Sequence, residues 1–246
     1  MIKIIMWITK FIVVALTALL FASCNYSNNF KSIVGSGKVI TEKRTVQGDF
    51  RNVSVSNAID LVIEQSDKTE ITVEADDNLI NGITTRVEGN TLVIKSDYNS
   101  FKNIKSKRVI VKMPFIDKIK ASSGSSVKSQ NVLRGEDISL DASSSGNMSL
   151  NIESDAITCE TSSGSSIVIE GKALKLNVSA SSGSDISAKR LLANEIEAQA
   201  SSGATVYVHP IVSLKADASS GGNINYNSVP KSIEKKSSSG GSIDQD

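Results

Sequence analysis

The chain has 246 residues with 27 basic and 26 acidic side chains, a formal net charge of +1. That near-neutral balance excludes the strong basic field by which proteins attract nucleic acid, so no nucleic-acid partner is expected. Aromatic residues make up only 4% of the chain, so the core must come mainly from Val, Ile, Leu and Ala, which favours a thin, β-rich interior.

Residues 1–23 are predicted to be a lipoprotein signal peptide. Lys3 and Lys10 precede an apolar run over residues 11–22 that ends in small residues, the arrangement of an export signal. The run is shorter than the roughly 20 apolar residues that a membrane-spanning helix needs. An uncleaved membrane anchor is the alternative, because the apolar residues can also be counted from Ile4 onward.

Residues 20–24, LFASC, resemble a bacterial lipobox, in which the cysteine becomes the lipidated N-terminus of the mature protein. The resemblance implies that Cys24 carries acyl chains and anchors the protein in a membrane, since each buried CH₂ contributes about 0.8 kcal/mol. Residues 24–36 are then a linker. Lipidation of Cys24 leaves Cys159 without a partner in the chain, so we expect Cys159 to be a small apolar core residue.

Several strands are predicted before residue 121. Residues 50–63 alternate between apolar and polar side chains, the period of a half-buried strand, and residues 70–75 and 91–95 follow as further strands. Within the first segment, residues 55–59 (VSNAI) are a candidate degenerate copy of a motif that recurs later. Residues 76–82 (DDNLING) are predicted to be a turn or a short helix, and their acidic start is expected to act as a cap or turn rather than to bind calcium.

Residues 121–246 contain seven regular copies of a four-residue motif, typically Ala-Ser-Ser-Gly. Each copy continues with period-two alternation, which predicts strands and not helices. Stacking of the copies predicts an all-β fold, a parallel β-helix with coils of about 20 residues spaced about 4.8 Å apart. The copies begin at positions spaced by 18 to 21 residues, a period that indicates a solenoid: Ala121, Ala142, Thr161, Ala180, Ala200, Ala218 and Ser237.

Stacked coils place equal positions of the motif in files along the molecule. The second serine shares the parity of the inward residues, so we expect a structural ladder of mutually hydrogen-bonded hydroxyls inside the coils, formed by Ser123, Ser144, Ser163, Ser182, Ser202, Ser220 and Ser239. The first serine faces outward and gives a candidate surface ladder for a glycan or another chain, formed by Ser122, Ser143, Ser162, Ser181, Ser201, Ser219 and Ser238. A glycine follows where the chain bends. In the second copy Ser145 takes its place, from which we infer that the bend slides by one residue.

These features together resemble the family of bacterial envelope proteins known as putative auto-transporter adhesins with a head GIN domain. The resemblance is carried by residues 50–63, 71–80 and 87–94, by the Met113-Pro114 pair and by the Ser-Ser-Gly copies. It implies a right-handed β-helix over residues 37–246 in an exported, lipidated protein. It brings no catalytic residue.

Localisation is predicted from the residues after the lipobox. Residues 25–29 lack the acidic run that resembles a surface-export signal in such bacteria. We therefore expect an outer-membrane lipoprotein that faces the periplasm rather than the exterior.

Catalytic motifs are weak in this sequence. Ser125 with Lys128, and Ser228 with Lys231, match the S-x-x-K pattern of penicillin-recognising enzymes, but both pairs lie in predicted strands or turns and not on a helix. His209 is the only histidine, so a serine-protease triad and a closed zinc site both lack residues. A polysaccharide lyase or hydrolase is the alternative function, and it requires three or more carboxylates that converge in one groove.

The sequence therefore predicts a non-enzymatic lipoprotein of the cell envelope. We expect an adhesin or binding scaffold that engages a protein or polysaccharide partner through the β-helix surface, without a metal or a cofactor.

Overall fold

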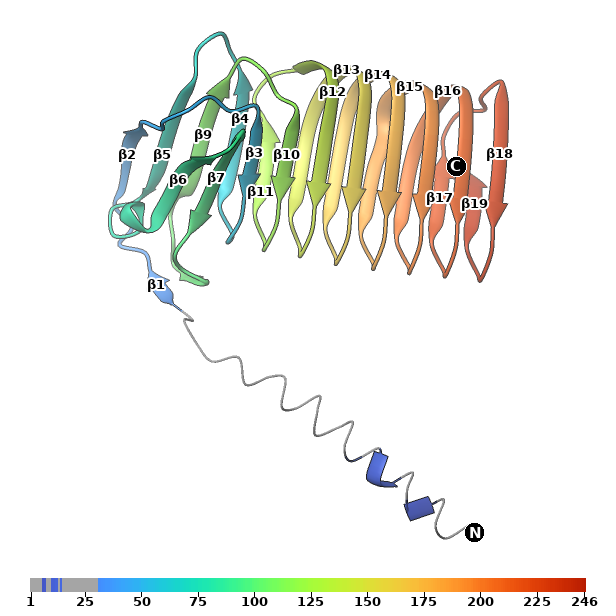
Figure 1. Cartoon of the computed structure of the whole chain (residues 1–246), viewed down its shortest axis with the longest axis horizontal. Helices are drawn as coiled ribbons and strands as arrows, with labels where there is room; N and C mark the ends of the chain where they lie inside the picture. Colours follow the sequence, from blue (N-terminus) through green and yellow to red (C-terminus); the bar gives the residue numbers. More distant parts are fainter. Residues whose placement is uncertain (1–5, 8–9, 13, 15–30) are drawn as a thin grey trace. The chain divides into compact units, whose positions relative to one another are not determined.

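The computed structural model describes residues 6–7, 10–12, 14 and 31–246 (Figure 1). Cys24 and most of the predicted signal peptide lie outside the described residues, so lipidation stays a prediction. The described positions before residue 15 are helical. None of the helical segments in the described part of the chain has the length and apolarity that crossing a membrane requires.

The chain divides into two compact units, Met1–Lys31 and Ser32–Asp246. In the first unit, the rings of Trp7 and Phe11 stack with their centroids 6.3 Å apart. The second unit is a β-solenoid of about seven turns with coils of roughly 19 residues, which confirms the predicted parallel β-helix (Figure 1).

The strands of the second unit lengthen in its regular part, where one strand covers most of a coil. One 3₁₀ helix, η1 (Ile80–Gly82), lies among them. The strands are β1 (Ser32–Val34), β2 (Val39–Arg44), β3 (Asn52–Val55), β4 (Asp60–Gln65), β5 (Glu70–Asp76), β6 (Ile83–Glu88), β7 (Thr91–Ser96), β8 (Ser100–Lys102), β9 (Lys107–Met113), β10 (Lys118–Ala121), β11 (Ser126–Ser129), β12 (Leu133–Ala142), β13 (Asn147–Thr161), β14 (Ser166–Ala180), β15 (Asp185–Ala200), β16 (Thr205–Ala218), β17 (Asn223–Tyr226), β18 (Ser232–Ser237) and β19 (Ser242–Gln245).

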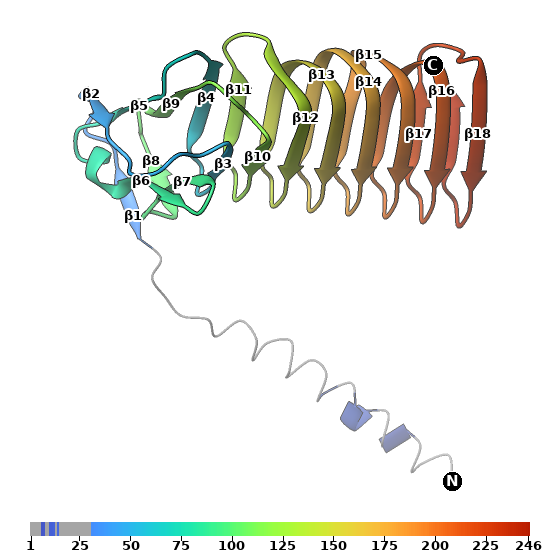
Figure 2. The ribbon, with the colours of Figure 1, turned by 45° about the horizontal axis from the view of Figure 1, so that its top comes forward.

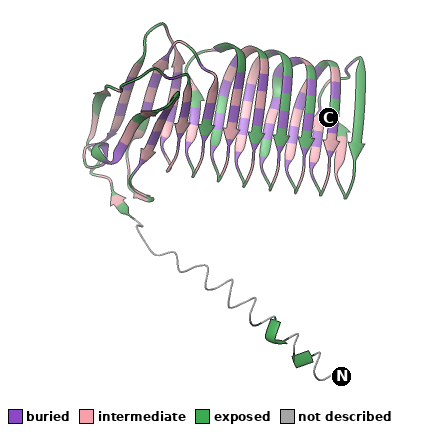
Figure 3. Ribbon diagram, in the orientation of Figure 1, coloured by how far each residue is buried: buried purple, intermediate pink, exposed green. Residues whose placement is uncertain are grey.

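Each regular coil runs along one face of the solenoid, bends, and returns along the other face to a tight turn at the motif (Figure 2). In β16, Val206 and Val208 face the interior before the bend, and Leu214 and Ala216 face it after the bend. Successive coils pair in parallel with equal positions opposite each other, as Ile196 does with Leu214. The core consequently consists of columns of like apolar residues, seen as repeated buried bands in Figure 3.

The first coil, formed by β3 and β4, lies between two later parts of the chain. β10 and β11 pair in parallel with one side of it, and β7 and β9 pair in parallel with the other. Beyond β9, β5 and then β2 continue as antiparallel strands, and β6 forms a hairpin with β7. The degenerate copy of the motif at residues 55–59 is confirmed, because Val55 pairs with Ala121 and the following Asn57 and Ala58 have positive φ.

The folded unit begins earlier than the sequence predicts. Residues 32–34 form β1, which pairs in parallel with β8, so the end of the predicted linker 24–36 is part of the fold. Three-residue strands give no alternation over 4–8 residues, which is why the pattern missed this one.

Asp76 holds the start of the folded unit in place. Its Oδ2 accepts the N–H of Gly37 at 2.9 Å, and its Oδ1 accepts those of Lys105 at 3.0 Å and Ser106 at 2.9 Å. A Cβ on Gly35 would lie 2.4 Å from this carboxylate, so glycine lets the backbone approach it. Asp76 thus binds backbone groups of two segments, one at Gly37 and one at residues 105–106. The expected turn is seen in its backbone, since the N–H of Leu79 donates to the carbonyl oxygen of Asp76 at 2.8 Å, whereas η1 has no side-chain cap hydrogen bond.

Candidate functional site

The motif turns share one backbone geometry. In all seven regular copies the second serine has φ between 48° and 55°, and the residue after it also has positive φ. Two consecutive residues with positive φ characterise a type I′ turn. In five copies the carbonyl oxygen before them accepts the N–H three residues on, as Ser201 accepts that of Ala204 at 3.1 Å. The chain therefore reverses within two residues at each corner.

The predicted inward ladder of second serines is wrong, because all of these serines are exposed. Alternation extended from the buried Ala200 places Ser202 inside, but the turn interrupts the strand and directs that side chain outward. The chain returns to the interior at Ala204, which is 0% exposed. The exposed serines are Ser123, Ser144, Ser163, Ser182, Ser202, Ser220 and Ser239.

Backbone groups, not hydroxyls, link the corners of neighbouring coils. In the first six regular copies, the N–H after the second serine donates to the carbonyl oxygen of the second serine in the next coil, as Gly183 does to Ser202 at 3.0 Å. In the second copy Ser145 occupies the glycine position with a φ of 61° and donates to Ser163 at 3.2 Å. The inferred one-residue slide of the bend is therefore wrong, since Ser145 adopts the left-handed conformation in register.

The first serines form the file that the sequence predicts as a surface ladder. Their N–H groups donate to the residue before the turn in the preceding coil, as Ser201 does to Ala180 at 3.0 Å. All are half-buried except Ser238, which is exposed, and whether they bind a partner stays a prediction: Ser122, Ser143, Ser162, Ser181, Ser201, Ser219 and Ser238.

The S-x-x-K match at the first regular turn is not a catalytic pair. Ser125 is fully buried, and its Oγ has no hydrogen-bond partner. Lys128, three residues later on β11, is exposed, because residues three apart on a strand face opposite sides. At the same position of a later coil, the Oγ of Ser184 contacts the Oγ1 of Thr161 at 2.9 Å, so this position serves the core.

A groove along the bend side of the coils is the candidate binding site. It consists of three depressions of about 700, 720 and 520 Å³. The first and second depressions share Arg51, Pro114 and Phe115 among their lining residues, and the second and third share Arg134 and Gly135. We name these three adjoining depressions the bend groove. It extends from β2 and β5 to β16.

Phe115 stands between the first two depressions and is 59% exposed. It follows Pro114, whose ring and missing N–H favour the end of β9 at this point. The guanidinium carbon of Arg51 lies 5.0 Å from the centroid of the Phe115 ring, within the range of a cation–π contact. Arg51 Nε also lies 3.2 Å from Asp117 Oδ2. The groove thus presents an aromatic ring beside an ion pair.

Gln65 ties together the two segments that line the second depression. Its Nε2 donates to the carbonyl oxygens of Pro114 at 3.0 Å and Arg134 at 2.9 Å, and its Oε1 accepts the N–H of Arg134 at 2.6 Å. Asn131 adds a reciprocal pair, accepting from Gln65 N at 3.0 Å and donating to Gln65 O at 2.9 Å. These bonds hold the shape of the groove before any ligand binds.

The third depression is the most apolar in its side chains. Leu174, Leu192 and Ile211 from three successive coils line it and are 40–53% exposed. Exposed leucine and isoleucine side chains that share one depression mark a candidate interaction surface.

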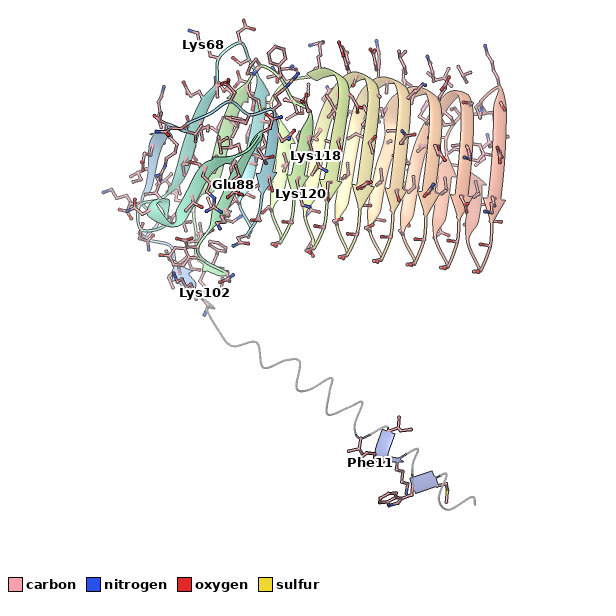
Figure 4. All side chains as sticks on the ribbon, viewed as in Figure 1. Phe11, Lys68, Glu88, Lys102, Lys118 and Lys120 are labelled. Atoms are coloured by element: carbon pink, nitrogen blue, oxygen red, sulfur yellow. The ribbon has the colours of Figure 1, made fainter. Side chains whose placement is uncertain are left out.

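The outward faces of the coils are covered by ion pairs between neighbouring strands. Lys120, labelled with Lys118 in Figure 4, lies 3.1 Å from Asp141 in the next coil. Lys215 lies 3.0 Å from Glu197, and this hydrogen bond raises the pKa of the lysine. Since these charges neutralise one another, the outward faces present fewer groups that could bind a partner than the bend groove does.

Three carboxylates line the second depression: Asp117, Glu136 and Asp137. This meets the condition that the sequence sets for the carbohydrate-active alternative. Glu136 and Asp137 are exposed, and Asp117 is paired with Arg51, whereas a general acid for glycoside cleavage is held protonated by burial.

Within the described residues, no three His, Cys, Asp or Glu side chains form a group that could hold a metal ion.

Sequence reasoning missed the bend groove because its residues follow no period. Phe115 is an isolated aromatic after Met113-Pro114. Leu192 and Ile211 belong to apolar pairs that interrupt the alternation. Such interruptions were the available signal, because two adjacent residues of a strand cannot both face the same interior, so at least one apolar residue of each pair is directed outward.

Comparison with known proteins identifies relatives of the whole solenoid. The family described as "Putative auto-transporter adhesin, head GIN domain" matches residues 49–230. The chain is similar to the solved structure of a putative adhesin from Bacteroides fragilis NCTC 9343, with 21% identity, a TM-score of 0.80, and coverage of 87% of this chain and 100% of that one. A search of curated protein sequences finds no match.

Two further solved structures have the same fold. A putative adhesin from Parabacteroides merdae ATCC 43184 shares 21% identity at a TM-score of 0.69, covering 88% of this chain and 99% of that one. A structure described as a putative lipid binding protein, from Parabacteroides distasonis ATCC 8503, shares 22% identity at a TM-score of 0.69, covering 88% and 100%. At these identities the likeness shows the fold alone.

Proposed function

Because the chain belongs to the head GIN domain family of putative auto-transporter adhesins, we propose that it is a non-enzymatic binding scaffold of the cell envelope. The observation that carries the proposal is the bend groove, in which the exposed ring of Phe115 and the exposed Leu192 and Ile211 are flanked by ion pairs. An elongated groove with apolar side chains and fixed polar groups suits an extended partner.

The partner class that this chemistry favours is a polysaccharide chain. An exposed aromatic ring can cover the apolar face of a sugar ring, and carboxylates and guanidinium groups such as those of Asp117 and Arg51 accept from and donate to its hydroxyls. Acidic and basic side chains both line the groove, so the groove attracts a strongly charged polymer only weakly. A protein segment is the competing occupant.

The test is a binding measurement on the unit Ser32–Asp246, which is compact by itself, against envelope polysaccharides and, separately, envelope proteins. Phe115→Ala is expected to weaken polysaccharide binding about tenfold or more, the loss typical of an anchoring aromatic. Phe115→Tyr keeps the ring and is the matched control, expected to bind as the unchanged chain does. If Phe115→Ala binds as strongly as the unchanged chain, the bend groove is not the binding site. If only envelope proteins are captured, the partner is a protein and not a polysaccharide.

We also propose that the protein is an outer-membrane lipoprotein anchored through Cys24 and facing the periplasm. The lipobox-like residues 20–24 and the absence of acidic residues in 25–29 support this. Labelled palmitate should enter the unchanged protein but not Cys24→Ala. Protease added to intact cells should leave the unchanged protein uncut, and cleavage would place it on the outer surface.

The carbohydrate-active alternative rests on the three carboxylates of the second depression. If Asp117, Glu136 or Asp137 catalyses cleavage, polysaccharides that bind should be shortened on incubation. Among Asp117→Asn, Glu136→Gln and Asp137→Asn, the variant that removes the catalytic carboxylate should then abolish the shortening and keep the binding. A scaffold leaves the chain length of its ligand unchanged.

A further inference from the structure

The C-terminal coil differs from all others in the residues it turns inward. One interior column runs through the coils in pairing register, and its buried members are apolar: Leu92, Val53, Ile119, Leu140, Cys159, Val178, Ala198 and Ala216. The next member of this column is Lys235, which pairs with Ala216. On the opposite face Gln245 follows the buried Tyr226 in the same way.

Lys235 extends across the end of the core. Its Nζ contacts the hydroxyl of Tyr226 at 2.8 Å and the carbonyl oxygen of Ile243 at 3.4 Å. The Nζ also lies 4.5 Å from the centroid of the Tyr226 ring. Lys235 belongs to β18 and Ile243 to β19, so this one side chain connects the two faces of the last coil.

The two strands of this coil are sheet edges. β18 pairs with β16 and β19 pairs with β17, and within residues 31–246 neither strand has a second neighbour. The N–H groups of Ser242 and Asp246 donate to the preceding coil. Because alternate residues of a parallel strand face opposite neighbours, Ile243 and Gln245 direct their backbone groups away from it. All of β18 is exposed, as its uniform colour in Figure 3 shows.

Such an edge is a template for another chain, and the best-fitting one is a second copy of this edge. The two copies would continue both sheets and join their interior columns end to end. Their Lys235 ammonium groups would then meet inside one shared core, where like charges without an opposite charge beside them are strongly unfavourable. An inward-pointing charge is a known means of protecting an edge strand.

We propose that Lys235 keeps the C-terminal end of the solenoid from joining a second copy of this chain. The lysine closes the end of its own core while its charge remains in contact with water. The proposal is independent of what the bend groove binds.

The experiment measures the mass of the unit Ser32–Asp246 by sedimentation over a range of concentrations. The unchanged unit should stay monomeric over the whole range. Lys235→Met, which removes the charge and keeps the length, should dimerise at concentrations at least about tenfold below the highest one at which the unchanged unit is still monomeric. Lys236→Met is the matched control. Lys236 is the neighbouring lysine, faces outward and pairs with Asp217 at 3.4 Å, so its replacement should leave the monomer.

A second variant shows where any new dimer forms. Ile243→Pro removes an N–H of the free edge that the fold does not use, so the double variant Lys235→Met/Ile243→Pro should return to a monomer with unchanged circular dichroism. A monomeric Lys235→Met that is folded by the same criterion overturns the proposal. So does dimerisation of the unchanged unit through this end, or a Lys235→Met dimer that persists with Ile243→Pro.

Discussion

The carboxylate of Asp76 accepts the backbone N–H of Gly37 at a distance of 2.9 Å, across 39 residues of sequence. Burial of Asp76 by itself favours the protonated acid, but backbone hydrogen bonds from Ser106, Gly37 and Lys105 outweigh it and lower the pKa of the carboxyl. The ionised carboxylate of Asp76 is therefore more stable, relative to the protonated acid, in the folded protein than in the unfolded chain.

Asp76→Asn is expected to reduce the free energy of unfolding by about 2 kcal/mol at pH 7, since hydrogen bonds to a charged group are lost. A lowered folded pKa means that the contribution is complete above the ordinary value of 3.8 and disappears as the pH falls through the lower folded value. Urea unfolding at several pH values should show the two proteins converging below pH 3.8. A difference that is constant with pH would contradict this assignment.

Ser145→Gly should stabilise the protein by about 0.5–1 kcal/mol, because glycine adopts the left-handed conformation without the cost that a Cβ imposes. Ser145 has a φ of 61° at a position that is glycine in the other regular copies. The control adds a Cβ at the equivalent glycine of another copy. Gly203 has a φ of 73° and no atom within 4 Å of an added Cβ, so Gly203→Ala should destabilise through backbone strain alone. Denaturant midpoints measure both.

Gln65→Ala should weaken ligand binding at the bend groove although Gln65 need not touch the ligand. The substitution removes the bonds to Pro114 and Arg134 and should also cost about 1–3 kcal/mol of stability. Asn131→Ala, which removes only the neighbouring reciprocal pair, should have a smaller effect on binding. Titration with the ligand and urea unfolding separate the two effects.

Cys159 should resist thiol reagents in the native protein. Its side chain is 0% exposed, and burial raises the pKa of the thiol. The reagent therefore cannot reach the sulfur, and the reactive thiolate form is disfavoured. In the unit Ser32–Asp246 it is the only cysteine. Labelling at pH 8 should therefore follow the unfolding transition in urea, and rapid labelling without denaturant would show that the coil opens locally.

The regular half of the fold was predictable because its information is local and repeated. Alternation around Ile196 and Ala200 predicts strands, and the recurrence of the motif predicts that equal positions stack. The same alternation placed Ser202 on the wrong side, since a rule with period two does not apply across two left-handed residues. For that position, turn chemistry decides and strand parity does not.

The order of strands in the first half could not be read from the sequence. β9 lies between β4 and β5 although both precede it in the chain, and no residue pattern encodes such an insertion. The bend groove escaped prediction for a related reason. Phe115, Arg51 and Arg134 come together only when distant segments are stacked, and exposed positions are under no periodic constraint.

The position of the β3–β4 coil between β7/β9 and β10/β11 makes growth of the solenoid one-directional. The strands on one side of that coil end in antiparallel partners, whereas the other side offers a parallel surface on which each following copy reproduces the one before it. Duplication or deletion of a whole copy would therefore lengthen or shorten the solenoid by about 4.8 Å without altering the end formed by the antiparallel strands β2, β5 and β6. The length of the solenoid is therefore set by the number of motif copies and does not depend on the strands that precede the first regular copy.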